Sequence, residues 1–498
     1  MWDLITKIIK KKEIWVILII SFIALALRLY RLGANDLWYD EVFSVLISKN
    51  PLHNWNPPVY FITLDYWIKL FGVSEFSLRF PSLVFGVISI PCLFFLGKTV
   101  FNSRVGISAC LLMCLSSFHL WYAQEARPYS LSVFLSILST YFFYRFLTEG
   151  RFKFGLSYVL SSILGLYSDI TYYHLVLLFT QLLGGFLFVK KHLRLKLIFA
   201  FSFICLIFSL RAEHIISKFL YVKDGFWISA VYLKSLIFTI ENFTLGYNVW
   251  TWLYWLSDLV VLIILFYVFL AFRRKKEWRE KIFFFVILSF FPLGTAYIFS
   301  KIFFPVYLGR AMIIFSPYYY ILLALGIDCL ANRLLKKVMV VIIFLVMLVS
   351  LAGYYLNLMP TVFEHHPGVV LKKPFKAAVN FVENNFKPGD TVMHTNSASW
   401  EVFKFYSNNK TIKYKLLFAP KMIDTNWNRP LESGGEVLNI EGIAAINSQR
   451  IWVISCGWER NKKFNENSKE VNSEMSKIYK LDLSLEFDGL WVYRYIKL

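Results

Sequence analysis

Two adjacent carboxylates, Asp40 and Glu41, stand among aromatic residues in the segment 37–44, just after the first long apolar run of the chain. A carboxylate at a membrane boundary is costly to desolvate unless it faces a polar cavity, so such a residue is a candidate for function. An ionised carboxylate there could act as the general base that takes a proton from a hydroxyl group. The alternative is that both residues only stabilise the first turn of a short interfacial helix.

Further candidate residues, some cationic and one a carboxylate, follow in two later segments. Gln124, Glu125, Arg127 and Tyr129 lie in a turn between two apolar runs, and Arg310 begins a late apolar run. Chemistry at an outer membrane face usually draws on lipid-linked donors, whose phosphate needs cations, while the acceptor hydroxyl needs a base. Each residue also has an ordinary explanation, because surface Glu-x-Arg turns are usually solvated and an arginine at a helix end usually extends its head group into water.

Composition sets the class of protein. The chain has 498 residues, of which 57% are hydrophobic, and its mean hydropathy is +0.55, which is typical of a polytopic membrane protein. The net charge of +21 comes from basic residues scattered between apolar runs, a pattern of topology determinants and not of a nucleic-acid groove. Five of the six cysteines lie in apolar segments, so we expect no structural disulfide and no zinc site.

The apolar runs predict a membrane domain that is all helical. Basic residues gather at alternate junctions between the runs, which places those junctions and the N-terminus on the cytoplasmic side. The first loop, the turn at 124–128 and the C-terminal region then lie outside. We expect about eleven spans of ~20 residues, at approximately 13–30, 80–99, 104–121, 128–147, 153–168, 171–189, 196–211, 248–272, 282–303, 311–330 and 338–356.

The first outer loop contains a helical segment of its own. Pro57-Pro58 can open a helix, and residues 59–71 repeat apolar side chains at helical spacing. The segment is short and carries charged residues, so we expect it to lie along the headgroup region as an interfacial juxtamembrane helix. The alternative is an additional span, which would reverse the charge pattern that follows it.

Beyond residue 359 the composition becomes that of a soluble domain. Residues 375–386 show one apolar helical face, and short apolar segments at 391–394, 411–417, 450–454 and 490–493 predict strands. We therefore expect two domains: a transmembrane domain at 1–359 and a small extracytoplasmic α/β domain at 360–498.

Four motifs in order resemble one family. They are Leu37-Trp38-Tyr39-Asp40-Glu41, Asn56-Pro57-Pro58-Val59-Tyr60-Phe61, Phe76-Ser77-Leu78-Arg79-Phe80-Pro81-Ser82 and Gln124-Glu125-Ala126-Arg127-Pro128-Tyr129. The chain thereby resembles the GT-C membrane glycosyltransferases, in the family 39 type branch of protein O-mannosyltransferases, lipid A aminoarabinose transferases and RgtA/B/C/D-like transferases of lipopolysaccharide-core sugars. The resemblance is dense over 13–147, weak around Arg310, and only architectural after residue 359.

The resemblance implies an inverting glycosyltransferase of the cell envelope. It would move a sugar from a polyprenyl-phosphate donor to a hydroxyl of a glycolipid, polysaccharide or protein at the outer face of the cytoplasmic membrane. Asp40 matches the catalytic aspartate, and Glu41 is the second carboxylate of that motif and would orient the acceptor or a neighbouring cation. The resemblance assigns substrate binding to Asn56, Tyr60, Gln124, Glu125, Arg127, Tyr129 and Arg310.

One position departs from the family's pattern. Some relatives have Lys or His just before the Pro-Pro pair, where this chain has Asn56, which removes one candidate phosphate ligand. His53 is the candidate substitute. Lys218, Lys223 and Lys234 in the loop at 212–247 could also attract a phosphate, although a solvated loop explains them equally well. No cofactor is expected, because one Asp-Glu pair does not establish a metal site.

A secondary transporter or lipid flippase is the alternative function. Transporters tend to show inverted repeats, broken helices in mid-span and charges at the bilayer midplane. In this sequence the charges of interest cluster at one face and no repeat is visible, which favours the glycosyltransferase.

Overall fold

The computed structural model describes residues 11–53, 56–168, 171–188, 191–223, 228, 230–358, 369, 372–409, 411–418, 436–456 and 471–498. The chain forms two compact units. Unit 1 comprises Met1–Leu32, Ile47–Val222 and Ile228–Pro367, and unit 2 comprises Gly33–Leu46, Lys223–Trp227 and Gly368–Leu498. The expected domain boundary falls within residues 359–368, outside the described residues. Residues 33–46, which the sequence placed with the membrane domain, group with the C-terminal residues.

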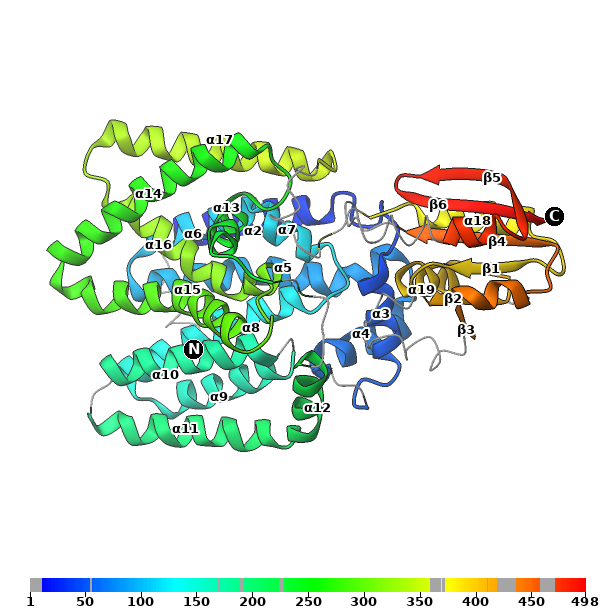
Figure 1. Ribbon diagram of the computed structural model, residues 1–498. Coiled ribbons are helices and arrows are strands. Elements are labelled where there is room, and N and C mark those ends of the chain that lie inside the picture. The colour runs from blue at the N-terminus through cyan, green and yellow to red at the C-terminus, as the bar shows by residue number, and fades with distance from the viewer. Residues whose placement is uncertain are drawn as a thin grey trace. The chain divides into compact units, whose positions relative to one another are not determined.

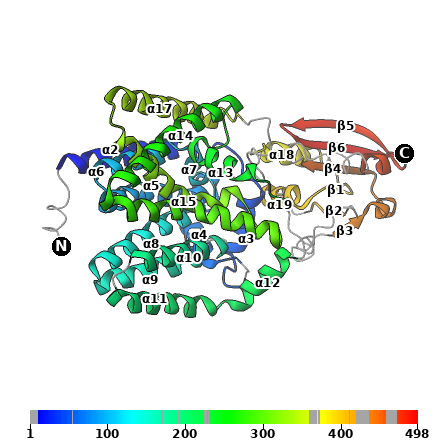
Figure 2. The same ribbon diagram turned by 60° about the vertical axis from the view of Figure 1, so that its left-hand side comes forward.

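Unit 1 is built from helices (Figure 1). Figures 1 and 2 both show α9, α10 and α11 side by side, with α12 turned away at the end of α11. The helical elements are α2 (Lys11–Leu29), α4 (Pro58–Phe71), α5 (Glu75–Val100), α6 (Ser103–Leu115), α7 (Ser117–Ala123), α8 (Tyr129–Glu149), α9 (Phe152–Leu166), α10 (Thr171–Phe188), α11 (Lys191–Ser209), α12 (Ala212–Lys223), α13 (Lys234–Leu245), α14 (Thr251–Arg274), α15 (Lys276–Ile302), the 3₁₀ helix η1 (Gly309–Phe315), α16 (Ser316–Cys329) and α17 (Arg333–Tyr355).

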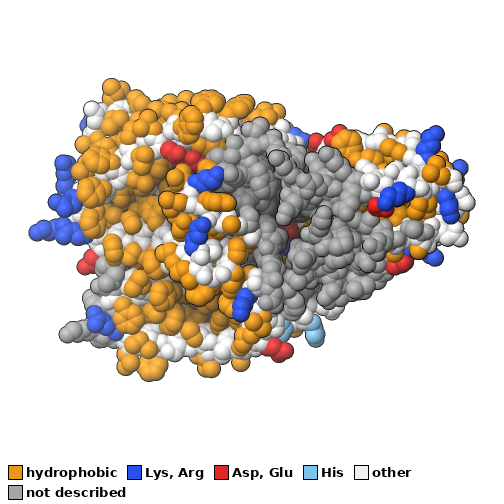
Figure 3. Space-filling view, in the orientation of Figure 1, with side chains coloured by type: hydrophobic (Ala, Val, Ile, Leu, Met, Phe, Trp, Pro, Cys, Tyr) orange, Lys and Arg blue, Asp and Glu red, His pale blue; other side chains and the backbone are white. Residues whose placement is uncertain are grey.

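Several of these helices are long and apolar enough to cross a membrane. Within the described residues there are six such helices, or up to eight if each of two bent helix pairs forms one span. The expected membrane domain is therefore confirmed as a class, while the count of eleven spans stays a prediction. Large apolar side chains such as Phe199 and Trp255 are exposed, and Figure 3 shows hydrophobic side chains spread over the helical unit. Such a surface is stable against lipid chains and not against water.

The segment after Pro57 forms the helix expected in the first loop. Pro58 occupies the first turn of α4, where a missing N–H costs nothing, and Gly72 ends the helix with φ of 76°. Leu64 follows Tyr60 and Phe61 by four and three residues, which is about one turn, so the three side chains share the buried face of α4. At 14 residues α4 is short for a span.

Unit 2 contains the expected α/β domain. Its six-stranded sheet has the order β3-β2-β1-β4-β6-β5, in which the first four strands are parallel and β6 pairs antiparallel with both of its neighbours, β4 and β5. Val392 on β1 stands opposite Trp452 on β4. The elements are α18 (Phe375–Asn385), β1 (Thr391–His394), α19 (Ser397–Tyr406), β2 (Tyr414–Phe418), β3 (Glu436–Asn439), the 3₁₀ helix η4 (Ile440–Ala445), β4 (Arg450–Cys456), β5 (Tyr479–Phe487) and β6 (Leu490–Lys497).

The alternation of side chains along β1 and β4 gives the sheet two buried faces. His394 and Trp452 contact α19 and α18, through Phe403 and Phe381, with ring centroids 5.1 and 6.2 Å apart. Met393, Ile451 and Val453 point to the other face and form a core with residues 443–446 and 471–479. Strands buried on both faces read as continuous apolar runs, which is why the sequence predicted β1 and β4.

We predict that His394 makes the stability of unit 2 depend on pH. Its ring is buried and its Nδ1 lies 3.1 Å from the Ser399 hydroxyl, and burial lowers the pKa of His394 from 6.5 to about 3. Unfolding therefore takes up a proton below pH 6.5, so the stabilisation present above that pH is lost as pH falls, by about 1.4 kcal/mol per pH unit. Hydrogen exchange of the β1 amides in the intact protein, corrected for intrinsic rates, should report this loss.

The aromatic but non-titrating variant His394→Phe should lose this pH-dependent component, whatever its absolute stability. His53→Phe, at an exposed position, is the matched control and should keep it. An unchanged pH slope in His394→Phe would contradict the assignment.

Candidate active site

The Asp-Glu motif opens a short helix, α3 (Tyr39–Ser48), with both carboxylates in its first turn. Acidic residues are favourable there because the first-turn N–H groups point toward them. Glu41 Oε2 accepts a hydrogen bond from the Trp38 N–H at 3.4 Å, which is half of a capping box. Glu41 is fully buried, whereas Asp40 is half-buried. The two carboxylates therefore differ in their access to a substrate.

A lysine of unit 2 neutralises the buried carboxylate. Lys372 Nζ lies 3.4 Å from Glu41 Oε2, and their side chains are 10% and 0% exposed. A counter-charge offsets the cost of burying a carboxylate, so this pair favours the burial of Glu41. Nothing in the sequence indicated Lys372, because a lysine beside a second lysine is typical of a solvated surface and no local pattern connects it to residue 41.

Two further hydrogen bonds fix the segment that leads into α3. The Leu37 N–H donates to the Tyr406 hydroxyl at 2.7 Å, and Asp36 Oδ2 accepts from the Lys376 N–H at 2.8 Å. The second bond caps the first turn of α18, whose N–H groups have no partner within their own helix. The segment 33–46 is thus held by α18, α19 and Lys372 of the same unit.

In unit 1, hydrogen bonds join three of the sequence motifs. The Tyr60 and Ser82 hydroxyls are 2.9 Å apart, and Ser82 donates to the Arg127 carbonyl at 3.0 Å. Arg79 of the same motif as Ser82 donates to the Leu32 carbonyl at 2.9 Å. The Arg127 side chain is half-buried. The motifs are therefore one assembly in space, although about 20 to 45 residues separate them in sequence.

The turn that carries Gln124 and Glu125 is held by its own side chains. Gln124 Nε2 donates to the carbonyls of Arg28 and Tyr30, both at 2.8 Å, and its Oε1 accepts from the Tyr354 hydroxyl at 2.6 Å. Trp121 Nε1 donates to Glu125 Oε1 at 2.7 Å. Three bonds occupy the Gln124 amide, so its geometry favours a role in fixing the turn.

Charged residues from distant segments meet at Tyr247. The Tyr247 and Tyr122 hydroxyls are 2.7 Å apart, and the Tyr122 and Tyr129 rings are 4.6 Å apart between centroids. Burial raises the pKa of Tyr247, the charge of Arg310 opposes that shift, and the charge of Glu125 adds to it. The charges of Glu125 and Arg310 therefore both act on one tyrosine pair, against which Tyr129 packs. The sequence analysis missed Tyr247, since one of 29 tyrosines carries no local signal.

The other predicted residue of unit 1, Asn56, has a cationic neighbour. Lys218 Nζ donates to Asn56 Oδ1 at 3.3 Å. Among the described residues, no group of three or more His, Cys, Asp or Glu side chains is arranged to hold a metal ion. Of the predicted catalytic and substrate-binding residues, Asp40 and Glu41 lie in unit 2 and the others lie in unit 1.

Comparison with known proteins identifies the fold. Residues 55–212 match the family model described as dolichyl-phosphate-mannose-protein mannosyltransferase. Crystal structures of ArnT from Cupriavidus metallidurans, in the apo state and bound to undecaprenyl phosphate, superpose with TM-scores of 0.63 and 0.60 at 12% sequence identity. Each comparison covers 96% of this chain, and 97% and 98% of ArnT. The resemblance to GT-C membrane glycosyltransferases is confirmed.

A shorter match is to an uncharacterized protein of Aquifex aeolicus (strain VF5), 28% identical over 163 residues. The match covers 29% of this chain and 33% of that relative's length, so the chain spans about a third of the curated relative it matches.

We predict that Lys372→Met releases α3. Removing one partner of a buried ion pair costs about 3–5 kcal/mol, because the Glu41 carboxylate keeps its burial and loses this counter-charge. Amide exchange in residues 39–46 should accelerate by about a hundredfold or more, at 1.4 kcal/mol per decade. Lys413→Met, which removes an exposed lysine of the same unit, should leave exchange there unchanged.

The double variant Glu41→Gln/Lys372→Met leaves neither charge behind and should recover most of the protection. Unaltered exchange of α3 in Lys372→Met would show that the pair does not hold the helix.

Proposed function

We propose that this chain is an inverting glycosyltransferase that moves a sugar from a polyprenyl-phosphate donor to an acceptor hydroxyl. The family-model match over residues 55–212 and the ArnT-like fold support this proposal, and ArnT itself has been crystallised with undecaprenyl phosphate. The acceptor would be a glycolipid, a polysaccharide or a protein. The observation that carries the proposal is that Asp40 is half-buried on a helix that neighbouring contacts hold in position.

Asp40 is suited to be the general base. Its side chain is half-buried. The hydrogen bond from the Leu37 N–H to the Tyr406 hydroxyl fixes the segment that leads into its helix, and the next residue, Glu41, forms an ion pair with Lys372. A catalytic side chain gains most when rigid neighbours hold it in position before the substrate arrives. Because Glu41 is fully buried, we assign it a positioning role, and Asp40 is the carboxylate available to an acceptor.

The proposed reaction is a single displacement. The acceptor oxygen attacks the anomeric carbon on the face opposite the phosphate while Asp40 takes the hydroxyl proton. The bond between the anomeric carbon and the phosphate oxygen breaks, and polyprenyl phosphate leaves with the electron pair. The configuration at the anomeric carbon inverts, and the leaving phosphate needs cations to offset its charge but no strong general acid.

The residues of unit 1 would bind the donor. Arg127 and Arg310 are the proposed partners of the donor phosphate, because guanidinium groups form charge-assisted hydrogen bonds with phosphate oxygens. Tyr129 and Glu125 surround the same tyrosine pair as Arg310 and would contact the sugar or its phosphate. Tyr60 and Gln124 would shape the site through the hydrogen bonds that hold the motifs together.

We further propose that the protein is a multi-pass protein of the cytoplasmic membrane with its C-terminal residues outside. The basic junctions of the sequence support this orientation. A cysteine at Asn461 should then react with a membrane-impermeant thiol reagent in intact cells, and a cysteine at Lys275 should react only after permeabilisation. The parent chain gives the background from its own six cysteines. Labelling at 275 with protection at 461 would reverse the orientation.

The variant Asp40→Asn tests the base directly. It keeps the size of the side chain but cannot accept a proton, so turnover should fall by about 10²–10⁴-fold while donor binding is retained. The assay is turnover with a polyprenyl-phosphate sugar and a hydroxyl acceptor, beside equilibrium binding of the same donor. Asp65→Asn, which removes a carboxylate paired with the exposed Lys69 on α4, is the matched control.

A loss confined to the Michaelis constant would mean that Asp40 only binds substrate. Turnover of Asp40→Asn within about threefold of the parent would rule Asp40 out as the base, because a positioned base contributes far more than that.

A further inference from the structure

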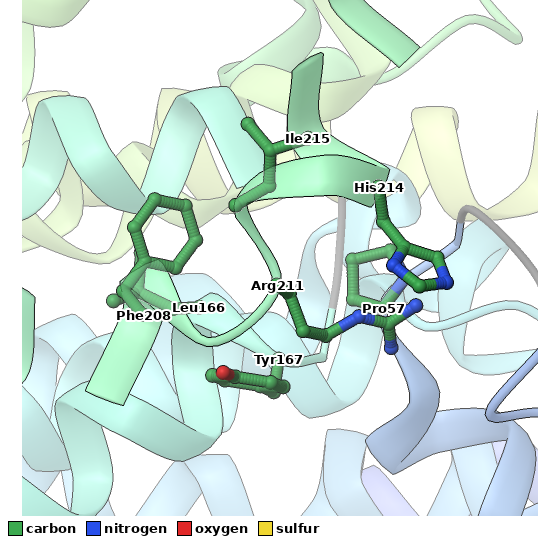
Figure 4. Close-up of a pocket in the computed structure, with 7 residues that line it drawn as sticks. All are labelled: Pro57, Leu166, Tyr167, Phe208, Arg211, His214 and Ile215. Carbon is green, nitrogen blue, oxygen red and sulfur yellow. The ribbon is translucent and has the colours of Figure 1, made fainter. Parts of the chain in front are cut away.

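A fully buried arginine, Arg28, lies in the last turn of α2. The head group of a long cationic side chain normally extends into polar surroundings. Arg211 of the same unit shows this usual behaviour, because it lines an open pocket with His214 and Pro57 (Figure 4). A guanidinium that is removed from water needs partners that offset its charge, so the contacts of Arg28 indicate its role.

The Arg28 guanidinium binds carbonyls near the C-terminal ends of two helices. Its Nη1 donates to the Ala24 carbonyl of α2 at 3.2 Å and to the Cys114 carbonyl of α6 at 3.4 Å. Its Nη2 donates to the Met113 carbonyl of α6 at 3.3 Å. The C-terminal end of a helix carries a partial negative charge, so the two helix ends offset part of the cost of burying the cation.

These bonds stabilise the break between α6 and α7. The first helix ends at Leu115, the second begins at Ser117, and their axes differ by 62°. The carbonyls in the last turn of a helix have no N–H partner within that helix, and Met113 and Cys114 lie in this turn of α6. Because Arg28 supplies donors for both carbonyls, it favours the bent arrangement over one continuous helix.

The backbone of Arg28 holds the other end of α7. Its carbonyl accepts a hydrogen bond at 2.8 Å from Nε2 of Gln124, which is the residue that ends α7. The helix between these two contacts has only seven residues. The side chain and the carbonyl of Arg28 therefore hold the two ends of one short helix.

Close packing against α5 adds to this restraint. A methyl group added at Gly86 of α5 would lie 2.9 Å from the Ala123 Cβ of α7 and 3.4 Å from the Arg28 Nε. Carbon atoms in favourable contact are about 3.5–4.0 Å apart, so the added group would have to displace its neighbours. The helices α2, α5 and α7 thus meet closely at this glycine.

The direction of α7 sets the position of several residues of the candidate active site. Trp121 of α7 donates to Glu125 at 2.7 Å, and the Tyr122 hydroxyl lies 2.7 Å from that of Tyr247. In the turn that follows, the Arg127 N–H donates to the Glu125 carbonyl at 2.8 Å. A change in the angle between α6 and α7 would displace these groups together.

We infer that Arg28 is a positioning residue of the candidate active site. Its guanidinium fixes the angle between α6 and α7, so that Tyr122, Glu125 and Arg127 are in place before a donor binds. Because Arg28 is fully buried, it acts through α7 and not by contact with the donor. Its effect on donor binding rests on the proposed function, which assigns the donor to Glu125 and Arg127.

Equilibrium binding of radiolabelled undecaprenyl phosphate to the purified full chain, expressed per folded molecule, tests this inference. Arg28→Gln stays polar but loses the charge, and it should bind about tenfold more weakly or worse, because the displaced Arg127 loses charge-assisted contacts. Arg28→Lys keeps a cation at the helix ends and should bind more tightly than Arg28→Gln. The control Ile282→Ala opens a cavity at a buried position of α15 and should lower the melting temperature without changing the affinity.

A second variant displaces α7 while leaving Arg28 unchanged. Gly86→Ala should weaken binding, and Gly86→Ala/Ala123→Gly, which removes the opposing methyl group, should recover most of it. If Arg28→Gln folds, parent-like binding by it overturns the inference; if it does not fold, parent-like binding by Gly86→Ala does so. Binding by Arg28→Lys no tighter than by Arg28→Gln, or an equal loss in Ile282→Ala, would overturn it as well.

The same variants separate this inference from the proposed function. If Arg127→Gln/Arg310→Gln weakens undecaprenyl phosphate binding and Arg28→Gln does not, the positioning role fails and the proposed function stands. If Asp40→Asn turns over normally while Arg28→Gln binds weakly, the proposed reaction fails and the positioning role stands. If the parent binds no undecaprenyl phosphate, the proposed function fails, and amide exchange across residues 117–123 decides: faster exchange in Arg28→Gln than in Ile282→Ala supports the hold on α7, and equal exchange overturns it.

Discussion

The buried ion pair between Glu41 and Lys372 is the constraint on which the candidate active site depends. A carboxylate with no exposure is tolerated only with a counter-charge, and here the counter-charge comes from the other end of the sequence. The helix that carries Asp40 therefore takes its position from the C-terminal residues. The α/β domain thereby helps to position the helix that carries Asp40, because the Lys372 ammonium offsets the cost of burying Glu41 on α3.

In the helical unit, buried uncharged polar groups also have partners from distant parts of the sequence. Polar atoms away from water need partners, and the Tyr60, Ser82 and Gln124 side chains bond to carbonyls or hydroxyls of other segments. These bonds use the residues of the sequence motifs. A motif of this kind thus combines two kinds of residue, since some of its side chains build the frame and others, such as Arg127 and Asp40, are those to which the proposed function assigns a substrate.

Charged side chains of the helical unit occur in two kinds of surroundings. Glu125 and Arg310 are nearly buried and meet around Tyr247, whereas Arg211 and His214 line an open-sided pocket beside exposed apolar side chains. Charges inside low-dielectric protein are costly and are retained where they are paired or used. Charges at an interface can keep their heads in polar surroundings while apolar neighbours contact lipid. The two clusters therefore lie in different electrostatic surroundings.

The sequence alone determined what local patterns encode. Apolar runs predicted the membrane domain, Pro57-Pro58 predicted the start of α4, and the helix and strands near residues 375–394 were found where expected. The order of four motifs indicated the GT-C resemblance and Asp40. Only the tertiary structure decided which residues accompany the predicted ones: Lys372 beside Glu41, Tyr247 within the influence of the Glu125 and Arg310 charges, and Lys218 beside Asn56. Helices and strands repeat over a few residues, so one segment suffices to predict them, whereas a charge pair joins side chains that the backbone brings together only after the whole chain has folded.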